Sequence, residues 1–227
     1  MGNPDPVRFQ TETPTLFASL AAQFDALGIH CYAFGGERAL ALAKTAGPEA
    51  VRAYGLDVGR SLCMLAVPYD LVPLAPESLA SKQLRVASFA SANHYAAIVR
   101  SLSKAAKNAG IREPRIFCNS RIAEKPLAVL SGLGHLGRSS LVVTPEYGSA
   151  VLLAGMVLPL DVPAELDACR SWDGNERQLE RAMEAGALCA SCTACVDACP
   201  CGAIGTQSGL DVDSCIQQWA SCSEMPP

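Results

Sequence analysis

Seven cysteines toward the C-terminal end of the chain form the clearest chemical pattern in the sequence. The stretch CASCTACVDACPCG, residues 189–202, has the spacing C-x2-C-x2-C-x3-C-P. In bacterial ferredoxins with this spacing, three thiolates of one tight loop bind one 4Fe–4S cluster and the fourth binds a different cluster. Zinc sites more often combine two separate C-x2-C pairs, so the spacing favours iron–sulfur over zinc. The seven are Cys189, Cys192, Cys195, Cys199, Cys201, Cys215 and Cys222.

The number of cysteines limits how many clusters this segment can hold. Two 4Fe–4S clusters would need eight thiolates, and the segment supplies seven. We expect one cluster on the C-x2-C-x2-C loop with Cys222 as its fourth ligand, which leaves Cys199, Cys201 and Cys215. A second cluster would need a remote cysteine such as Cys169, a ligand of another type, or a partner chain. One cluster and two clusters both stay open.

A glycine-rich stretch, GLGHLG at residues 132–137, matches the pattern G-x-G-x-x-G. The dinucleotide-binding fingerprint has to follow a strand and open a helix. Here the stretch follows a predicted helix and precedes a predicted strand, so we expect no dinucleotide site. Its glycines would instead form a turn that lets a cofactor or another backbone segment come close.

The composition is that of a globular chain with metal or redox chemistry. Half of the 227 residues are hydrophobic and 18% are charged, as in ordinary folded domains. The N-terminus has no basic stretch followed by an apolar run, and no apolar run approaches the roughly 20 residues of a membrane span. We therefore expect a cytoplasmic protein with no membrane partner. In that compartment, eleven cysteines favour metal or redox chemistry over disulfides.

Charge is distributed unevenly along the chain. Residues 161–227 contain eleven acidic residues and three arginines, whereas residues 1–160 contain fifteen basic and eleven acidic residues, and the total net charge is −4. Neither part contains a run of lysine and arginine, so the sequence shows no footprint for nucleic acid. We interpret the acidic part as a solvated surface, with a docking face as the alternative.

Strands and helices interleave along residues 1–160, which predicts a mixed domain of α and β elements. Hydrophobic periodicity and Gly/Pro signals predict strands at 29–34, 61–69, 84–90, 115–118, 139–144 and 150–157, and helices at 15–27, 36–47, 48–55, 93–110, 123–132 and 175–186. Residues 161–188 are expected to form a connector, and residues 189–227 a small iron–sulfur module.

Several of these stretches resemble the cobalamin-dependent epoxyqueuosine reductases of tRNA modification, which are relatives of reductive dehalogenases. The resemblance spans about residues 59–222 in separate motifs. These are GRSLCMLAVPY, ASFASANHY, EKPLAVLSGLGHLGRSSLVVTPEYGSAVLLAGM, CASCTACVDACPCGAI and LDVDSCIQQW.

The resemblance implies an α+β fold: a nitroreductase-like α/β domain that holds cobalamin, followed by a small ferredoxin-like 4Fe–4S module. The module would pass single electrons to the corrinoid, so the chain would be an oxidoreductase. The residues implied at the cofactor are His94, Gly134, Ser139, Val142, Leu153 and Ile216.

The chain also departs from the family pattern. A family lysine falls at Arg138 or its neighbour, a family glutamate falls at Gly155, and the family's catalytic aspartate falls at Cys118. The family continues with a second cysteine cluster and a helical tRNA-binding domain, whereas this sequence ends at Pro227. We therefore expect a small-molecule substrate or a redox partner protein and not tRNA, because tRNA binding depends on phosphate contacts from clustered Lys and Arg. The alternative is a non-catalytic electron-transfer or corrinoid-carrier protein, and a homodimer stays open.

Cys118 is the candidate catalytic residue, with three interpretations. A free cysteine at a strand end is most often a small apolar packing residue. As a thiol with a pKa near ~8.5 it would keep its proton at neutral pH and could donate it to a substrate. Nearby Arg121 could instead lower that pKa and favour a thiolate, which is a nucleophile or a ligand.

Overall fold

The structure is a computed structural model and describes residues 6–69, 94–184, 189–205 and 209–216. The predicted strand at 84–90 and Cys222 lie outside the described residues. The expected mixture of α and β elements is confirmed. In chain order the elements are α1 (Pro6–Ala26), β1 (Cys31–Gly35), α2 (Glu37–Lys44), α3 (Pro48–Tyr54), β2 (Ser61–Pro68), α5 (His94–Asn108), β3 (Arg115–Cys118), α6 (Glu124–Leu130), β4 (His135–Leu136), β5 (Val142–Val143), β6 (Val151–Leu158), α7 (Glu176–Ala182) and α8 (Ala194–Asp197).

A four-stranded sheet in the order β1-β2-β6-β3 forms the centre of the molecule, and neighbouring strands pair antiparallel. The two central strands pair along their whole length, from Ser61 opposite Leu158 to Pro68 opposite Val151. Both strands are continuous apolar runs in the sequence because each of their faces is covered by helices, so neither face needs polar side chains.

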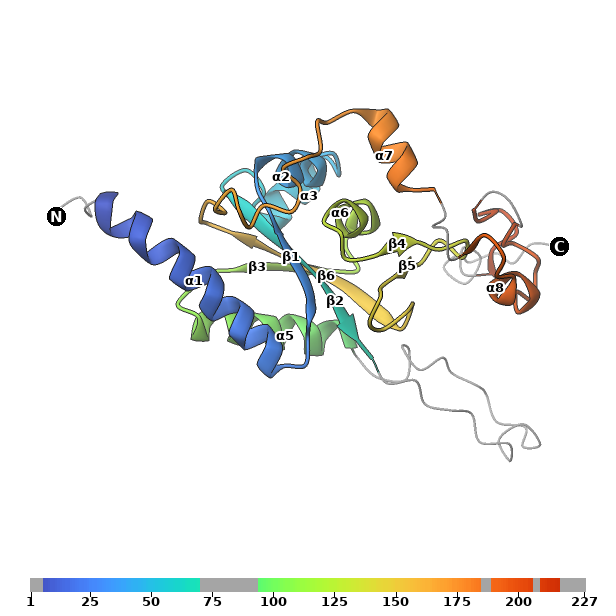
Figure 1. Ribbon diagram of the computed structural model, residues 1–227, viewed down its shortest axis with the longest axis horizontal. Helices are drawn as coiled ribbons and strands as arrows, with labels where there is room; N and C mark the ends of the chain where they lie inside the picture. The colour runs from blue at the N-terminus through green and yellow to red at the C-terminus, as the bar shows by residue number, and fades with distance from the viewer. Residues whose placement is uncertain (1–5, 70–93, 185–188, 206–208, 217–227) are drawn as a thin grey trace.

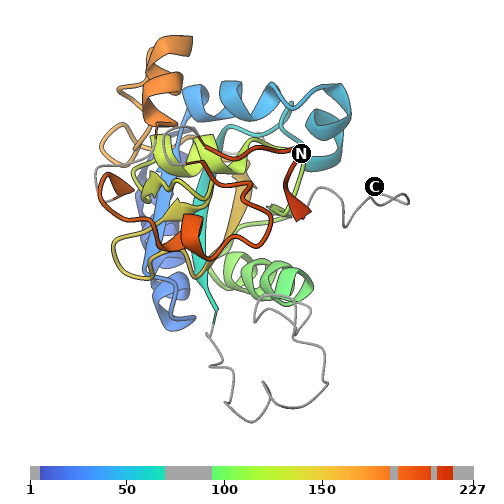
Figure 2. The ribbon, with the colours of Figure 1, turned by 90° about the vertical axis from the view of Figure 1, so that its right-hand side faces the viewer.

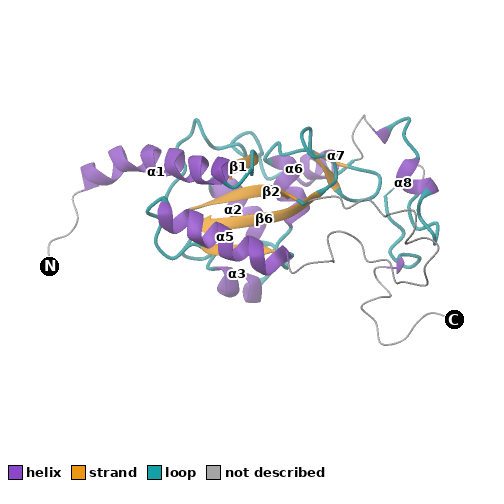
Figure 3. Cartoon of the chain, turned by 90° about the horizontal axis from the view of Figure 1, so that it is seen from below, coloured by secondary structure: helices purple, strands orange, loops and turns teal. Residues whose placement is uncertain are grey.

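Two layers of helices cover the sheet (Figure 2). α1 and α5 lie on one face, where Phe17, Phe24 and Leu102 are almost completely buried. α2, α3 and α6 lie on the other face, and Leu40 and Leu127 belong to the core on that side. The view from below shows α5 in front of the strands and α3 behind them (Figure 3). The sheet is therefore the middle layer of three.

Local sequence signals explain where two of the helices begin and end. α3 starts at Pro48, which suits a first helical position because its ring fixes φ, and it stops at Gly55, which is left-handed at φ +63°. α5 ends before Gly110, whose φ is +85°. The backbone N–H of Ile111 donates to the carbonyl of Ala106, which closes the helix in the way that a left-handed glycine allows.

The glycine-rich stretch forms the end of α6 and a short hairpin. Gly132 has a φ of +75° and follows the last residues of α6. β4 then pairs with β5, with His135 opposite Val143. A β-carbon on Gly134 would lie 2.3 Å from the carbonyl oxygen of Val143, so this position is a glycine because the two backbones approach closely. No helix starts at this stretch, whereas the dinucleotide-binding fingerprint opens a helix.

The last part of the described chain lies at one end of the molecule. Figure 1 shows α7 leading from the sheet region toward the cysteine segment with α8, which lies near the β4–β5 hairpin. Within this segment, Ala203 is almost fully buried and accepts a backbone hydrogen bond from Asp211. Among the described helices, none has the length and apolar character needed to cross a membrane.

Candidate functional site

A cavity of about 240 Å³ lies beside the start of β6. Its other walls come from β5, from the first turn of α5 and from the loop that follows β3. It combines an apolar wall from the strands with polar side chains from the loops. The lining residues are Tyr95, Asn119, Glu124, Lys125, Leu141, Val142, Ser149, Val151, Leu152 and Leu153. Such a mixture of apolar walls and a few convergent polar groups is typical of small-molecule sites.

The structure brings two of the sequence-predicted cofactor residues into this cavity and places the others elsewhere. Val142 and Leu153 both line the cavity. Ser139 lies in the turn between β4 and β5, and Gly134 faces the backbone of β5. Ile216, in the cysteine segment, has 64% of its surface exposed.

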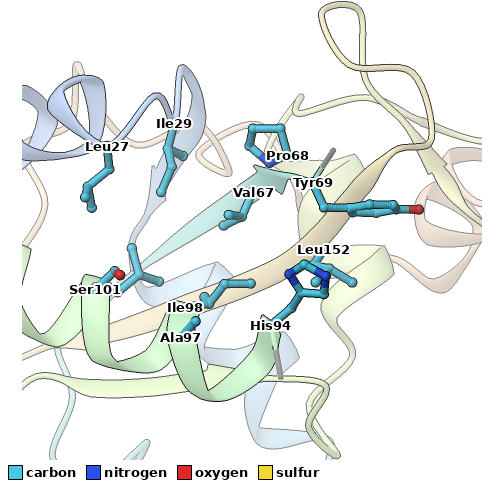
Figure 4. A pocket seen from close by; sticks show the side chains of 11 residues that line it. Leu27, Ile29, Val67, Pro68, Tyr69, His94, Ala97, Ile98, Ser101 and Leu152 are labelled. Atoms are coloured by element: carbon cyan, nitrogen blue, oxygen red, sulfur yellow. The ribbon is translucent and has the colours of Figure 1, made fainter. Parts of the chain in front are cut away.

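His94 lines a second cavity, of about 160 Å³, on the other side of the first turn of α5 (Figure 4). Its ring lies 6.1 Å from the ring of Tyr69, centre to centre. Leu152 lines both cavities, while the neighbours His94 and Tyr95 each face a different one. The first turn of α5 therefore separates the two cavities and contributes one side chain to each.

Cys118 lies at the end of β3, opposite Ala154 of β6. Its Sγ donates a hydrogen bond to the carbonyl oxygen of Leu153 at 3.2 Å. Burial, with a smaller contribution from the nearby Glu124, raises the pKa of this thiol to about 12. Arg121 pairs with Glu49 at 2.5 Å on the exposed surface and is not what sets this pKa. The geometry therefore favours a neutral thiol over a thiolate.

The sequence did not indicate that Glu124 and Tyr95, two titratable residues of the cavity, belong to the site. Glu124 stands in the first turn of α6, where an acidic residue is ordinarily explained by the helix dipole. Tyr95 is next to the expected His94 and reads as one apolar position of an amphipathic helix. Only the fold shows that both side chains face the same cavity.

The cysteine segment has the donor chemistry that a 4Fe–4S cluster requires. Its described cysteines are exposed or half-buried, and none forms a disulfide. The Sγ atoms of Cys199 and Cys201 lie 3.7 Å apart. Desolvation raises the pKa of Cys199, but hydrogen bonds, the largest from the backbone of Cys201 and Ala203, outweigh it and lower the pKa below its ordinary value. Hydrogen bonds to sulfur also tune iron–sulfur centres, so Cys199 has surroundings that suit a cluster thiolate, and the segment's other described cysteines are thiols free of disulfides.

No three potential ligands converge on a single point within the described residues, and the expected fourth ligand, Cys222, lies outside them. The remaining cysteines are part of the α/β region. Cys63 is completely buried in β2, and Cys31 donates from Sγ to the carbonyl of Leu133 at 3.4 Å. Cys169 is buried with its Sγ 3.5 Å from the hydroxyl of Ser131. Cys169 therefore packs in the core, apart from the cysteine segment.

The β4–β5 hairpin connects the cavity with the cysteine segment. Arg138, in its turn, donates a hydrogen bond from its guanidinium to the carbonyl oxygen of Cys189 at 2.6 Å. Val142, on its second strand, lines the cavity. The Nε2 atom of His135 is buried without a hydrogen-bond partner in the described part of the chain, which leaves a polar position for a bound group.

The cavity fits one part of a large planar ligand. Its volume of about 240 Å³ is below the roughly 300–1,000 Å³ of pockets that enclose a whole ligand. Apolar side chains from β5 and β6 could contact a ring system, and Asn119 and Ser149 could bind polar substituents at its rim. The residues present are therefore compatible with a corrinoid that extends beyond the cavity.

Comparison with known sequences found relatives that share one name, epoxyqueuosine reductase. No model of a known protein family matches the chain. The epoxyqueuosine reductase of Bacillus subtilis is 30% identical over 110 residues, which is 48% of this chain and 24% of that protein. The enzyme of Vibrio cholerae is 33% identical over 95 residues, 42% of this chain and 21% of the relative. The enzyme of Gloeobacter violaceus is 26% identical over 163 residues, 69% of this chain and 45% of the relative.

Solved structures of epoxyqueuosine reductases share the fold of this chain. Epoxyqueuosine reductase from Streptococcus thermophilus matches with a TM-score of 0.61 and 16% identity, over 92% of this chain and 59% of that one. The Bacillus subtilis structure matches with a TM-score of 0.59 and 19% identity, over 96% and 59%. A complex of epoxyqueuosine reductase with an epoxyqueuosine-modified tRNA stem loop matches with a TM-score of 0.55, again over 96% and 59%. The chain thus spans about six-tenths of these solved proteins.

These comparisons correct two expectations from the sequence. The expectation that tRNA is neither substrate nor partner is wrong, because a structure of the same fold binds a modified tRNA stem loop. The alternative of a non-catalytic carrier is not favoured, since the relatives found are reductases. The exclusion of tRNA relied on the net charge of −4 and on the end of the sequence at Pro227. Net charge averages over the whole surface, whereas phosphate contacts depend on local basic residues, and residues 1–160 alone carry fifteen of them.

The aligned sequences and the shared α/β fold agree on one group of proteins, and the chain is homologous to the epoxyqueuosine reductases.

Proposed function

We propose that the chain is a reductase that removes the epoxide oxygen from a modified nucleoside of tRNA, with an iron–sulfur centre and a corrinoid as cofactors. The names of its relatives supply the substrate class, because they act as epoxyqueuosine reductases and one is solved with an epoxyqueuosine-modified tRNA stem loop. The basic residues of 1–160 would provide the phosphate contacts.

The main support for this proposal is that the β4–β5 hairpin contacts both the cavity and the cysteine segment. Val142 on this hairpin lines the cavity, and Arg138 in its turn donates a hydrogen bond to the carbonyl of Cys189. Val142 is also a residue that the family resemblance implies at the corrinoid. A cofactor in the cavity and a cluster on the cysteines would thus share one supporting element.

The cysteines would hold the electron-transfer group. Cys189, Cys192, Cys195 and Cys222 would bind a 4Fe–4S cluster, which supplies single electrons at potentials that range from roughly −700 to +450 mV. A corrinoid, when bound, supplies a cobalt centre that accepts these electrons and reduces the substrate. In this proposal residues 1–160 form a nitroreductase-like cofactor domain, residues 161–188 a connector, and residues 189–227 a ferredoxin-like module.

The chain's own residues would position the substrate and exclude water. The apolar side chains of Val142 and Leu153 form one wall of the cavity, which lowers the local dielectric and strengthens polar contacts inside. Asn119 has a left-handed backbone at φ +53° and lines the same cavity. Asparagine adopts this conformation more readily than most other non-glycine residues, so the turn suits the residue that stands there.

Blocking the cavity tests where the cofactor binds. Ser149 is exposed and lines the cavity, so Ser149→Trp should fill it without disturbing the core, and cobalamin affinity should fall at least about tenfold, which corresponds to about 1.4 kcal/mol. Ser171 is also exposed but lines a different cavity, and Ser171→Trp is the matched control. The measurement is an anaerobic spectral titration of each variant with cob(II)alamin. Equal affinity in both variants, or no binding by the wild-type chain with its cluster intact, would argue against this site.

A further inference from the structure

Three side chains with an ionisable proton, each from a different element, lie in or beside the cavity of about 240 Å³. Tyr95 comes from α5, Cys118 from the end of β3 and Glu124 from the start of α6. Tyr95 and Glu124 line the cavity itself, and Cys118 is bound to the carbonyl of the lining residue Leu153. Each of the three interacts electrostatically with at least one of the others.

Glu124 is held in the cavity by the loop that precedes α6. Its Oε1 accepts two hydrogen bonds from Ser120, one from the backbone N–H at 2.8 Å and one from the hydroxyl at 2.7 Å. The Ser120 hydroxyl in turn accepts from the backbone N–H of Ile122 at 3.1 Å. The left-handed turn at Asn119 directly precedes Ser120. The carboxyl group is therefore fixed in position by the hydrogen bonds of this short loop.

The three groups differ widely in their ability to give up a proton near neutral pH. Burial raises the pKa of Cys118 to about 12, and its S–H is already donated to the carbonyl of Leu153. Burial also raises the pKa of Tyr95 above 10, with further contributions from Cys118, Glu124 and Tyr69. Burial raises the pKa of Glu124 from 4.5, and hydrogen bonds from Ser120 and Asn119 oppose this rise. A proton donor works best with a pKa near the operating pH, so among these three the carboxyl group is the effective acid.

We propose that Glu124 donates a proton to the substrate oxygen in this cavity, an inference that rests on the proposed function. The position where the relatives' pattern has an aspartate is occupied here by Cys118, and Glu124 reaches the same cavity from six residues further along the chain. Lys125, the next residue along the chain, also lines the cavity.

Reducing an epoxide to an alkene consumes two electrons and two protons and releases one water molecule. The O–H bond of Glu124 breaks, an O–H bond forms on the epoxide oxygen, and the resulting carboxylate regains a proton from solvent. The second proton comes from water, and a one-electron reductant supplies the electrons through the iron–sulfur centre of the proposed function.

The test compares Glu124→Gln with the wild-type chain and with Glu180→Gln, a control at an exposed glutamate on α7. Gln keeps an acceptor for Ser120 but carries no acidic proton. In cluster- and cobalamin-loaded chain, the rate of reduction of an epoxyqueuosine-modified tRNA stem loop should fall about 10²–10⁴-fold for Glu124→Gln and stay unchanged for Glu180→Gln. The wild-type rate should decline as the pH rises through the pKa of Glu124, and Glu124→Asp should restore part of the lost rate.

A second readout does not depend on turnover. In carboxyl-labelled, cobalamin-free chain, the glutamate ¹³C resonance that disappears in Glu124→Gln should titrate at a higher pH than the other glutamates. The inference is overturned if that resonance titrates with the exposed glutamates, or if an active wild type and Glu124→Gln react equally fast at every pH. A wild-type chain that binds cobalamin and tRNA but reduces nothing would instead overturn the proposed function.

Discussion

The variant Cys192→Ala is expected to lose most of its bound iron and sulfide, and with them every electron delivered to a substrate. Cys192 is the middle thiolate of the C-x2-C-x2-C loop and is exposed in the structure. A 4Fe–4S cluster needs four thiolates, and the spacing of this loop provides three of them from one turn of chain. Removing the middle one leaves three of the four ligands, so one iron of the cluster loses its thiolate and the cluster is no longer held firmly.

Anaerobic iron and sulfide analysis and the visible spectrum measure this loss. Cys31→Ser is the matched control, because Cys31 lies in β1 and its thiol contacts the carbonyl of Leu133 in the α/β region. Cys222→Ala should resemble Cys192→Ala if Cys222 is the fourth ligand. A wild-type chain that contains only zinc, or a Cys192→Ala variant with a full complement of iron, would contradict the assignment.

The variant Gly155→Ala is expected to be strongly destabilised. Gly155 lies opposite Phe117 in the β3–β6 pair, and an added β-carbon would lie only 1.9 Å from Cζ of that ring. Phe117 is itself 1% exposed and cannot turn aside. Overpacking of a filled core typically costs about 1–3 kcal/mol and occasionally more, and a clash this close belongs at the upper end of that range.

Urea unfolding of Gly155→Ala, Phe117→Leu and the double variant measures the clash directly. Because the smaller side chain makes room for the new methyl group, the double variant should be more stable than the sum of the two single changes by about 1 kcal/mol or more. Gly148→Ala is the control for an added methyl group without a clash. Nothing lies within 4 Å of a β-carbon at this position, and only the φ of +58° disfavours alanine there. Additive effects at 117 and 155 would mean that the ring is not what excludes a side chain from position 155.

This packing also bears on the chemistry of the site. The family resemblance puts a glutamate at the position of Gly155, and here the ring of Phe117 occupies that space. The cavity nevertheless contains a carboxyl group, because Glu124 enters it from the start of α6. An acidic group is thus available at the site although the aligned positions 118 and 155 both lack one.

The sequence predicted β2, β6 and α5 well because their signals are local, whereas the longest described helix, α1, was predicted only from residue 15 and begins at Pro6. β2 and β6 are continuous apolar runs, α5 has a clear helical period, and Gly55 and Gly110 mark helix ends. The sequence predicted only one strand of the β4–β5 hairpin. A strand was expected at 139–144, the region of β5, whereas β4 was not predicted. Two-residue strands have no periodicity, and this pairing depends on contact between the backbones of Gly134 and Val143.

The site was predicted only in part for a similar reason. Family motifs pointed to Val142 and Leu153, which meet in one cavity, but the fold also brings Tyr95 of α5 and Glu124 of α6 to this cavity. Neither residue can be recognised from its neighbours in sequence, since a tyrosine in an amphipathic helix and a glutamate in a first helical turn both have ordinary structural explanations. Similarly, net charge could not show where basic residues gather, so the expectation against tRNA failed.

The most direct test of the central claim is a single-turnover reaction with an epoxyqueuosine-modified tRNA stem loop. The full chain, with its cluster reconstituted and cobalamin added, is reduced anaerobically and mixed with the stem loop, and the nucleoside is analysed by mass spectrometry. We expect loss of one oxygen atom from the modified nucleoside, and no loss when either cobalamin or the cluster is left out. An unchanged nucleoside after incubation with a chain that holds both cofactors and binds the stem loop would contradict it.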